Sequence, residues 1–340
     1  MRFLLASILA LQLATAAAAP SGYLHRPEVK QFIKEMAKKH RFARKDLEFI
    51  FSRARYQPAI IKAMNQPLEV NSWQVYRALF VNPERIEAGV QFWNRNAEPL
   101  KRAANEFGAP EEIIVAIIGV ETIYGRNVGT YRVIDALSTL AFDYPKRAEF
   151  FRSELENYLV FTRDARLNAL RVKGSYAGAI GIPQFMPGTY RRFALDYDGD
   201  GRANLSSAAD AIGSIGNFLK AHGWIRGEPV AYGVEVSGEN WRKLASAGAA
   251  PAYRVADLPD FGVKLAASLP AETPCALIEL ETPGQASDFR LGLRNFQVLT
   301  FYNRSNLYAA AVFDLATEIA RSEAASRASA LPQIPADKKP

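Results

Sequence analysis

Apolar residues recur at the spacing of one helix face over most of the chain. Between residues 27 and 51, Phe32, Ile33 and Met36 share such a face in a stretch rich in lysine and arginine. The pattern therefore predicts a mainly α-helical protein. The predicted helices cover residues 27–51, 83–107, 113–120, 133–141, 146–163, 208–222 and 308–321.

The pattern changes after Trp224. Glycine, proline and short runs of β-branched or aromatic residues predict a small β-rich unit there, with strands at 230–236, 276–280 and 296–301. The helix that follows is expected to return and pack on the helical part. Residues 322–340, rich in Ala, Ser, Pro and Lys, are predicted to form a disordered tail. The fold class is therefore mainly α, with a smaller β part (α+β).

Residues 1–19 have the layout of a secretory signal peptide. Arg2 gives a positive start, an apolar run follows, and small residues end the segment. As a transmembrane helix the run is short and ends in alanines, although an uncleaved anchor stays an alternative. No cysteine lies near the cleavage region, which excludes lipid attachment there. We therefore expect a mature chain that is soluble, exported to the periplasm and without a membrane segment.

The length, composition and charge of the chain exclude several classes of protein. A length of 340 residues suggests two or three structural units. A single cysteine, Cys275, excludes a disulfide framework, a Cys-rich zinc site and an iron–sulfur cluster, and three scattered histidines leave no His-based metal triad. The formal charge of +7 favours an anionic partner, such as nucleic acid, a membrane surface or cell wall. Export makes nucleic acid an unlikely partner.

Glu121 is the most informative candidate for catalysis. It follows eight residues without a charge, and on a helix its neighbours are Ile117, Ile118 and Tyr124. Loss of hydration in such surroundings raises the pKa of a carboxyl group, which suits a general acid for a glycosidic oxygen. The alternative is a structural glutamate that is paired with Arg or Lys or capped by backbone donors.

A second candidate segment covers residues 173–187 and contains three glycines, which let a ligand approach the backbone closely. Ser175 and Gln184 can hydrogen-bond amide or hydroxyl groups, and Tyr176 or Phe185 can pack on the face of a sugar. The alternative is a tight turn between helices whose glycines serve packing.

The two segments together resemble the lytic murein transglycosylase B family. The matching motifs are Ile-Gly-Val-Glu-Thr-x-Tyr-Gly at 118–125 and Gly-Ser-Tyr-Ala-Gly-Ala-x-Gly-x-x-Gln-Phe-Met-Pro at 174–187. Further matches lie at 135–142, 144–149, 221–224 and 301–309, so the resemblance runs from about Pro27 to Arg321.

The resemblance implies a fold, a reaction and a set of domains. The fold is a lysozyme-like core (108–227) flanked by a helical domain (20–107, with the returning helix 308–321) and the β-rich domain (228–307). The implied substrate is the glycan strand of peptidoglycan, and no organic cofactor is implied. Glu121 would protonate the leaving oxygen and then act as base on the C6 hydroxyl, which closes a 1,6-anhydro ring on N-acetylmuramic acid (MurNAc). A lysozyme-type hydrolase and a non-catalytic wall-binding protein remain alternatives.

The resemblance also implies substrate-binding residues. A basic pair, Lys146 and Arg147, could meet substrate carboxylates, although the first is lysine where arginine is expected. Two other positions depart from the family pattern, with Phe218 in place of tyrosine and Pro183 in place of glycine. The expected sugar-binding residues are Ser175, Gln184, Phe185, Tyr302, Tyr308 and Tyr76.

An acidic loop at 196–210 has the spacing of a calcium site. Oxygen ligands occupy positions 1, 3 and 5 and a glycine occupies position 6, but Ser207 replaces the usual glutamate at position 12. The predicted ligands of a structural Ca²⁺ are Asp196, Asp198, Asp200, Asp210 and the backbone carbonyl of Arg202. The alternative is a metal-free Asp-Gly turn.

Overall fold

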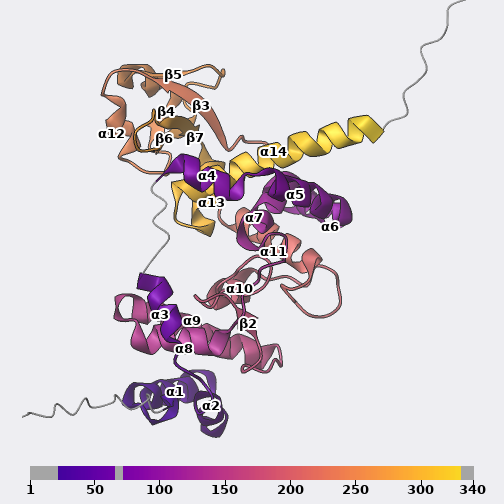
Figure 1. Ribbon diagram of the computed structural model, residues 1–340, viewed down its shortest axis with the longest axis vertical. Helices are drawn as coiled ribbons and strands as arrows, with labels where there is room; N and C mark the ends of the chain where they lie inside the picture. The colour runs from indigo at the N-terminus through magenta and orange to yellow at the C-terminus, as the bar shows by residue number, and fades with distance from the viewer. Residues whose placement is uncertain (1–21, 66–71, 331–340) are drawn as a thin grey trace, which may run out of the picture.

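Helices dominate the computed structural model, which describes residues 22–65 and 72–330 (Figure 1). The α-helices are α1 (Pro27–His40), α2 (Arg44–Phe51), α3 (Pro58–Asn65), α4 (Trp73–Phe80), α5 (Pro83–Arg95), α6 (Ala97–Phe107), α7 (Glu111–Thr122), α8 (Val133–Asp143), α9 (Ala148–Asp164), α10 (Pro187–Phe193), α11 (Ala208–Ala221), α12 (Trp241–Ala245), α13 (Arg294–Tyr302) and α14 (Asn306–Ala330). The 3₁₀ helices are η1 (Tyr23–His25), η2 (Pro145–Arg147) and η3 (Val255–Phe261). The fold class predicted from the sequence is confirmed.

The strands form one small sheet and one two-stranded ribbon. The ribbon pairs β1 (Tyr131–Arg132) with β2 (Lys173–Gly174). The sheet is antiparallel, in the order β4-β6-β7-β3-β5. Its strands are β3 (Ala231–Val236), β4 (Tyr253–Arg254), β5 (Val263–Leu265), β6 (Pro274–Leu280) and β7 (Asp288–Gly292).

Strand β6 joins the sheet to the rest of the molecule because both of its faces are buried. Ala276 and Ile278 belong to the main core, whereas Cys275 and Leu277 belong to a second, smaller core inside the β unit. Successive side chains of a strand point to opposite faces, so this alternation follows directly from the extended backbone.

Local signals set the helix boundaries that the sequence predicted. The Asn82 side chain accepts a hydrogen bond from the Arg85 backbone N–H at 3.0 Å, which caps α5 directly before Pro83. Gly108 ends α6 with a φ of +85°, a left-handed conformation that glycine adopts at little cost. α7 then begins at Glu111, directly after Pro110.

Four predicted segments differ from the structure. Residues 27–51 form two helices, α1 and α2, because Arg41 takes a left-handed conformation with a φ of +57°, and residues 83–107 form α5 and α6, which meet at Asn96. Residues 296–301, predicted as a strand, belong to helix α13, in which Phe296, Val298 and Leu299 are all buried. A short apolar run fits a buried helix as well as a strand, and tertiary packing decides between them. Helix α14 continues to Ala330, so residues 322–330 are helical and only 331–340 of the expected tail lie outside the described residues.

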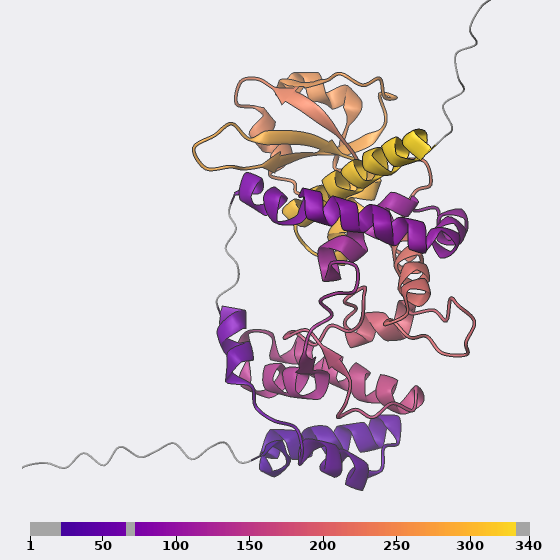
Figure 2. The same ribbon diagram turned by 45° about the vertical axis from the view of Figure 1, so that its right-hand side comes forward.

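The helical unit predicted for residues 20–107 is divided in space. Helices α1 to α3 lie at one end of the molecule beside α8 and α9, where Arg26 forms an ion pair of 2.8 Å with Asp143 (Figures 1 and 2). Helices α4 and α5 instead pack against α14, and α6 packs against α11 (Figure 2). The predicted signal peptide lies outside the described residues. No described helix is long and apolar enough to cross a membrane.

Candidate active site and metal loop

Helix α7 carries Glu121 in its last turn. The segment Ile113–Val120 is buried on all sides, so the helix runs through the core and only its end reaches the surface. It ends where Ile123 and Tyr124 both take the left-handed conformation, with φ values of +52° and +58°. Such a backbone is strained for a β-branched residue, and surrounding contacts must hold it in place.

Three contacts fix this strained end of α7. The Thr122 hydroxyl donates to the Ile182 carbonyl at 3.0 Å and accepts from the Gly125 N–H at 3.0 Å. The Tyr124 hydroxyl donates to the Arg85 carbonyl at 2.8 Å. Glu121 is therefore held from both sides, by α5 and by the glycine-rich segment.

Glu121 itself is partly buried and has a tyrosine partner. The Tyr308 hydroxyl donates to Glu121 Oε1 at 2.7 Å, although the two residues are 187 positions apart in the chain. Burial raises the pKa of Glu121 to about 7, against a smaller lowering by the Tyr308 hydrogen bond. The carboxyl group therefore exists in both protonation states near neutral pH, as an acid that must also act as a base requires.

An aromatic wall supports the tyrosine. The Tyr302 ring stacks on Tyr308 with the ring centroids 6.3 Å apart, and its hydroxyl donates to the Pro183 carbonyl at 2.7 Å. Burial, together with the charge of Glu121, raises the pKa of Tyr76 to about 12. Tyr76, Tyr302 and Tyr308, predicted as sugar-binding residues, are thus gathered around Glu121. Tyr308 is only 2% exposed and its hydroxyl binds Glu121, so it positions the carboxylate and does not offer its ring to a sugar.

The glycine-rich segment folds tightly against the end of α7. A Cβ on Gly129 would lie 2.1 Å from the Gly174 carbonyl oxygen, so the two backbones meet as closely as the glycines predicted. The Ser175 hydroxyl accepts from the Ala179 N–H at 3.1 Å, which leaves its own O–H available to a ligand. Gln184, at a φ of +51°, donates from its side chain to the Gly181 carbonyl at 2.8 Å.

Phe185 does not have the role that the sequence suggested. Only 2% of it is exposed, and its ring packs against Phe218 and Tyr302, with centroids 5.8 and 5.9 Å away. A covered ring cannot stack on a sugar, so Phe185 supports Tyr302 from inside the core. Phe218, which replaces an expected tyrosine, is likewise 5% exposed and packs against this pair.

The basic pair lies on η2. Lys146 and Arg147 are both exposed, and the Arg147 guanidinium lies 4.4 Å from the centre of the Phe150 ring. Within the described chain, no hydrogen bond or ion pair joins either side chain to Glu121 or to the glycine-rich segment. Their predicted contact with substrate carboxylates stays a prediction.

The acidic loop gathers three of its four aspartates. Carboxylate oxygens of Asp196, Asp198 and Asp210 lie within 4.8 Å of one another, as ligands at about 2.3–2.6 Å from a shared Ca²⁺ would. Asp200 is outside this cluster, and its carboxylate accepts from the Arg202 N–H at 2.9 Å. The geometry therefore fits a cation held by the other three.

Asp210 anchors this loop. It is fully buried and accepts hydrogen bonds from three backbone N–H groups, those of Tyr197 at 2.6 Å, Asp198 at 3.2 Å and Asn204 at 2.7 Å. The loop also touches the active site, because the Ile182 N–H donates to the Leu205 carbonyl at 2.8 Å. Ile182 is the residue whose carbonyl receives the Thr122 hydroxyl, so the acidic loop is two hydrogen bonds from the end of α7.

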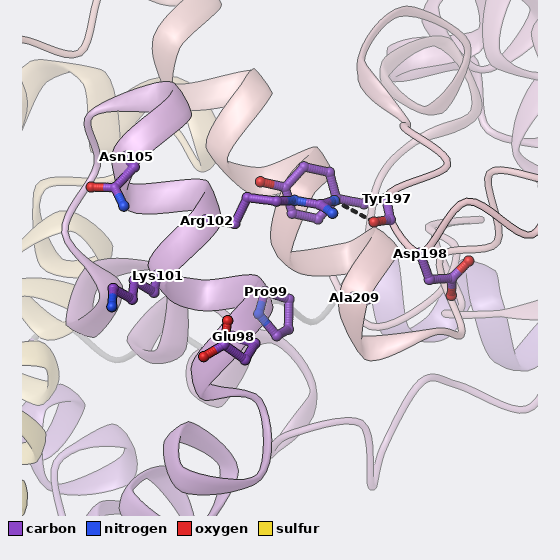
Figure 3. Close-up of a pocket in the computed structure, with 8 residues that line it drawn as sticks. All are labelled: Glu98, Pro99, Lys101, Arg102, Asn105, Tyr197, Asp198 and Ala209. Atoms are coloured by element: carbon purple, nitrogen blue, oxygen red, sulfur yellow. Dashed lines mark hydrogen bonds between the residues drawn. The ribbon is translucent and has the colours of Figure 1, made fainter.

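Helix α6 covers the other side of the acidic loop. The Arg102 guanidinium lies 3.4 Å from the centre of the Tyr197 ring and donates to the Tyr197 carbonyl (Figure 3). Arg102, Tyr197 and Asp198 line a pocket of about 550 Å³ between α6 and the loop. Glu121 and the predicted sugar-binding residues are not among its lining residues, so this pocket is separate from the candidate active site.

Comparison with known proteins identifies the family of this chain. The family described as the transglycosylase SLT domain matches residues 25–317. The chain belongs to this family, and it is a lytic transglycosylase. It is 39% identical over 308 residues to the membrane-bound lytic murein transglycosylase B of Escherichia coli K12, a match that covers 88% of this chain and 84% of the relative.

Solved structures share the fold over most of the chain. The soluble lytic transglycosylase SltB1 of Pseudomonas aeruginosa is 44% identical with a TM-score of 0.83, covering 88% of this chain and 100% of that one. Escherichia coli Slt35, solved in complex with calcium, is 38% identical with a TM-score of 0.80, covering 88% and 95%. Pseudomonas aeruginosa SltB3, solved with NAG-anhNAM-pentapeptide, is 28% identical with a TM-score of 0.75, covering 86% and 79%.

Proposed function

We propose that the protein cleaves the β-1,4 bond between MurNAc and N-acetylglucosamine in peptidoglycan, with Glu121 as acid and then base. The observation that carries this assignment is a partly buried carboxyl group whose pKa is raised to about 7 beside a single hydroxyl donor. The peptidoglycan fragment bound by the related SltB3 supports the same substrate class.

The reaction needs no added water. The protonated Glu121 gives its proton to the glycosidic oxygen as the bond from that oxygen to C1 of MurNAc breaks. The carboxylate then takes the proton of the C6 hydroxyl, and the C6 oxygen bonds to C1. The product is 1,6-anhydro-MurNAc, and Glu121 ends the cycle protonated as it began.

The surroundings of Glu121 favour this route over hydrolysis. Hydrolysing glycosidases generally use a second carboxylate about 5–9.5 Å from the first. The next two acidic residues in the chain are both engaged elsewhere. Asp135 is buried and pairs with Arg132 at 2.7 Å. The Asp143 carboxylate binds Arg26 at 2.8 Å and accepts from the Tyr23 hydroxyl at 2.7 Å, so it serves the packing of η1. The side chains that surround Glu121 are tyrosines instead, which suit sugar faces and hydroxyl groups.

Substrate binding is assigned to groups that keep a free polar atom or an open face. The Ser175 hydroxyl is partly exposed and can donate to a sugar. Gln184 is also partly exposed, and its side-chain carbonyl can accept from an amide or hydroxyl group. Tyr76, partly buried near Glu121, offers a ring edge and a hydroxyl.

A structural Ca²⁺ fits the acidic loop, where Asp196, Asp198 and Asp210 would hold it. When bound, the ion neutralises the repulsion among these carboxylates and stiffens the loop. The hydrogen bond from Ile182 to Leu205 then connects this stiffening to the glycine-rich segment. Calcium in the related Slt35 structure supports the choice of ion.

We assign the activity to the periplasm, on the basis of the signal-peptide layout of residues 1–19. The name of the Escherichia coli relative describes a membrane-bound enzyme. A test is to fractionate cells that produce the full chain and to sequence the N-terminus of the protein in the periplasmic fraction. An N-terminus near Ala19 or Pro20 supports export with cleavage, whereas an intact Met1 in the membrane fraction supports the uncleaved anchor.

The decisive experiment is mass spectrometry of purified peptidoglycan digested by the protein and by its Glu121→Gln variant. Anhydro-muramyl products from the unsubstituted protein alone would support the reaction and the role of Glu121. Reducing muramic acid ends would mean a lysozyme-type hydrolase. Binding without cleavage by either protein would mean a non-catalytic wall-binding protein.

A further inference from the structure

Nearly all of the net charge of the chain lies at one end of the molecule. Residues 22–55, which form η1, α1 and α2, contain ten lysines and arginines and four acidic residues. Their excess of six positive charges compares with +7 for the whole chain, so the rest of the protein is almost neutral. Figures 1 and 2 show α1 and α2 at the end opposite to the β unit.

The cations at this end fall into two groups. Arg26 and Lys39 form ion pairs of 2.8 Å with Asp143 and Glu156, which tie η1 and α1 to α8 and α9. Lys30, Lys34 and Lys38 are exposed instead, and among the described residues their side chains have no hydrogen bond or ion pair. These three lysines therefore form an exposed face of α1 whose cations have no ion pair among the described residues.

Helix stability does not explain this unpaired face. Lys30, Lys34 and Lys38 follow one another at i, i+4 and i+8, a spacing at which like charges repel. Arg44 and Lys45 open α2, where the positive end of the helix dipole disfavours cations. Lys38 lies in the last turn of α1, where the helix dipole favours a cation, but the repulsion at Lys30 and Lys34 and the cations that open α2 become favourable only when an anion is bound.

Two helices direct these cations at a common cavity. Lys30 and Lys34 from α1 and Arg44 from α2 line a hollow of about 340 Å³. Leu24 and Ile33 supply apolar lining, and Glu48 is the one acidic residue that lines it. Such a hollow suits a carboxylate at the end of a short aliphatic group.

We propose that the face formed by Lys30, Lys34, Lys38, Arg44 and Lys45 docks the enzyme on the carboxylates of peptidoglycan stem peptides. The proposal rests on the proposed function, because it takes the same polymer as its ligand. The paired cations fix this end to the catalytic part, so docking would hold Glu121 near the glycan mesh. Attraction between many weak charge pairs also raises the rate of encounter with an anionic polymer.

An anionic lipid surface is the less favoured partner. A helix that lies in a membrane interface exposes large apolar side chains beside its cations. The apolar residues of α1 do the opposite, since Val29, Phe32, Ile33 and Met36 are all 5% exposed or less. On α2 the one large exposed apolar side chain is Phe49, and the Arg53 guanidinium lies 3.6 Å from its ring centre, so it is a single ring beside a cation and not an apolar face.

The test measures sedimentation with purified sacculi in a Glu121→Gln background, so that the polymer stays intact. Lys30→Glu, Lys34→Glu and Lys38→Glu together should weaken binding about ten-fold or more at low salt and flatten its dependence on salt. The matched control replaces three exposed lysines on other elements, Lys62→Glu, Lys101→Glu and Lys243→Glu, and should bind as the parent does. A triple Lys→Gln variant at 30, 34 and 38 should fall between.

Further measurements separate the possible failures. With Glu121 restored, both glutamate triples should keep the parental melting temperature and the parental rate on a short glycan without stem peptides. Equal loss of sacculus binding in the test and control variants would overturn the proposal. Unchanged binding to sacculi, with binding to phosphatidylglycerol vesicles lost, would overturn it in favour of lipid. Failure of the proposed function would instead appear as absent anhydro products from the unsubstituted protein, whatever the binding result.

Discussion

Glu121 is a partly buried carboxylate and Asp210 a fully buried one, and they differ in the hydrogen-bond donors that surround them. Glu121 has one hydroxyl donor, Tyr308, and an apolar helix behind it. Asp210 accepts three backbone N–H groups and lies beside two other aspartates. The comparison shows that the donor set, more than burial itself, decides what an enclosed carboxylate can do. Glu121 can therefore exchange a proton, whereas the Asp210 carboxylate is held as an acceptor for backbone N–H groups.

The largest expected effect comes from removing the proton of Glu121. Glu121→Gln should lower the rate of anhydro-product formation by about 10²–10⁴-fold, because the amide can neither give nor take the proton. Binding to peptidoglycan should stay within about two-fold of the parent, since the shape is kept. Rates measured by product mass spectrometry within ten-fold of the parent would remove Glu121 from its role.

The second largest expected effect is the loss of stability when Asp210 is replaced. Asp210→Ala leaves three backbone N–H groups, of which that of Tyr197 is buried, without their acceptor and should lower the free energy of unfolding by about 2 kcal/mol. It should also remove the rise in melting temperature, of about 5 °C, that saturating calcium gives the parent. Asp200→Ala is the control, and should keep most of that rise because Asp200 lies outside the cluster. Equal melting temperatures of the parent in calcium and in chelator would contradict the metal site.

Glu121 should also make stability depend on pH. Its pKa rises from 4.5 to about 7 on folding, so the folded state holds the proton more tightly. The favourable contribution is complete below pH 4.5 and disappears as pH rises to about 7, a loss of about 3 kcal/mol. We expect the free energy of unfolding of Glu121→Gln, relative to that of the parent, to be higher at pH 8 than at pH 4.5. Denaturant unfolding at the two pH values measures this difference. If the free energies of unfolding of the two proteins changed with pH in the same way, the Glu121 carboxyl group would be hydrated and its pKa would not be raised by burial.

The smallest expected effect concerns the hydrogen bond from Tyr308 to Glu121. Tyr308→Phe removes the hydrogen bond that lowers the pKa of Glu121, so the alkaline limb of the kcat/KM profile should move upward from about pH 7. The rate at neutral pH should change less than about ten-fold. Tyr302→Phe is the matched control, because its hydroxyl binds the Pro183 carbonyl and leaves the limb in place. A limb that moves downward in Tyr308→Phe would contradict the direction of this hydrogen bond.

Local sequence signals predicted much of the fold. Helical periodicity located α7, α8, α9 and α11, and the Asn-Pro and Gly-x-Pro signals marked where helices start and end. The same reasoning was wrong for residues 296–301, because a run of six residues with four apolar or aromatic side chains fits a strand and a buried helix equally. Asn295 settles the matter through hydrogen bonds to Ile225 and Glu228, which no local pattern contains.

The candidate site, like the fold, was predicted from the sequence only where its features are local. The charge-free run before Glu121 and the Asp spacing at 196–200 are local, and each indicated a chemical group. Burial of Phe185 was not predicted, because its cover comes from Phe218 and Tyr302. The absence of Asp200 from the aspartate cluster was equally hidden, since the loop backbone turns its carboxylate to the Arg202 N–H.

Local patterns in the chain were enough to predict the helical class, the carboxylate at the end of an apolar helix, the acidic loop and the total charge. The donor that meets each carboxylate, and the place where the charge gathers, depend on contacts between distant segments. Tyr308 reaches Glu121 across 187 residues, and the cations of α1 are divided by contacts with α8 and α9 into paired and free groups. The reason is physical: periodicity and spacing record contacts within a few turns of chain, whereas hydration, hydrogen bonding and charge pairing are set by whatever the fold brings alongside.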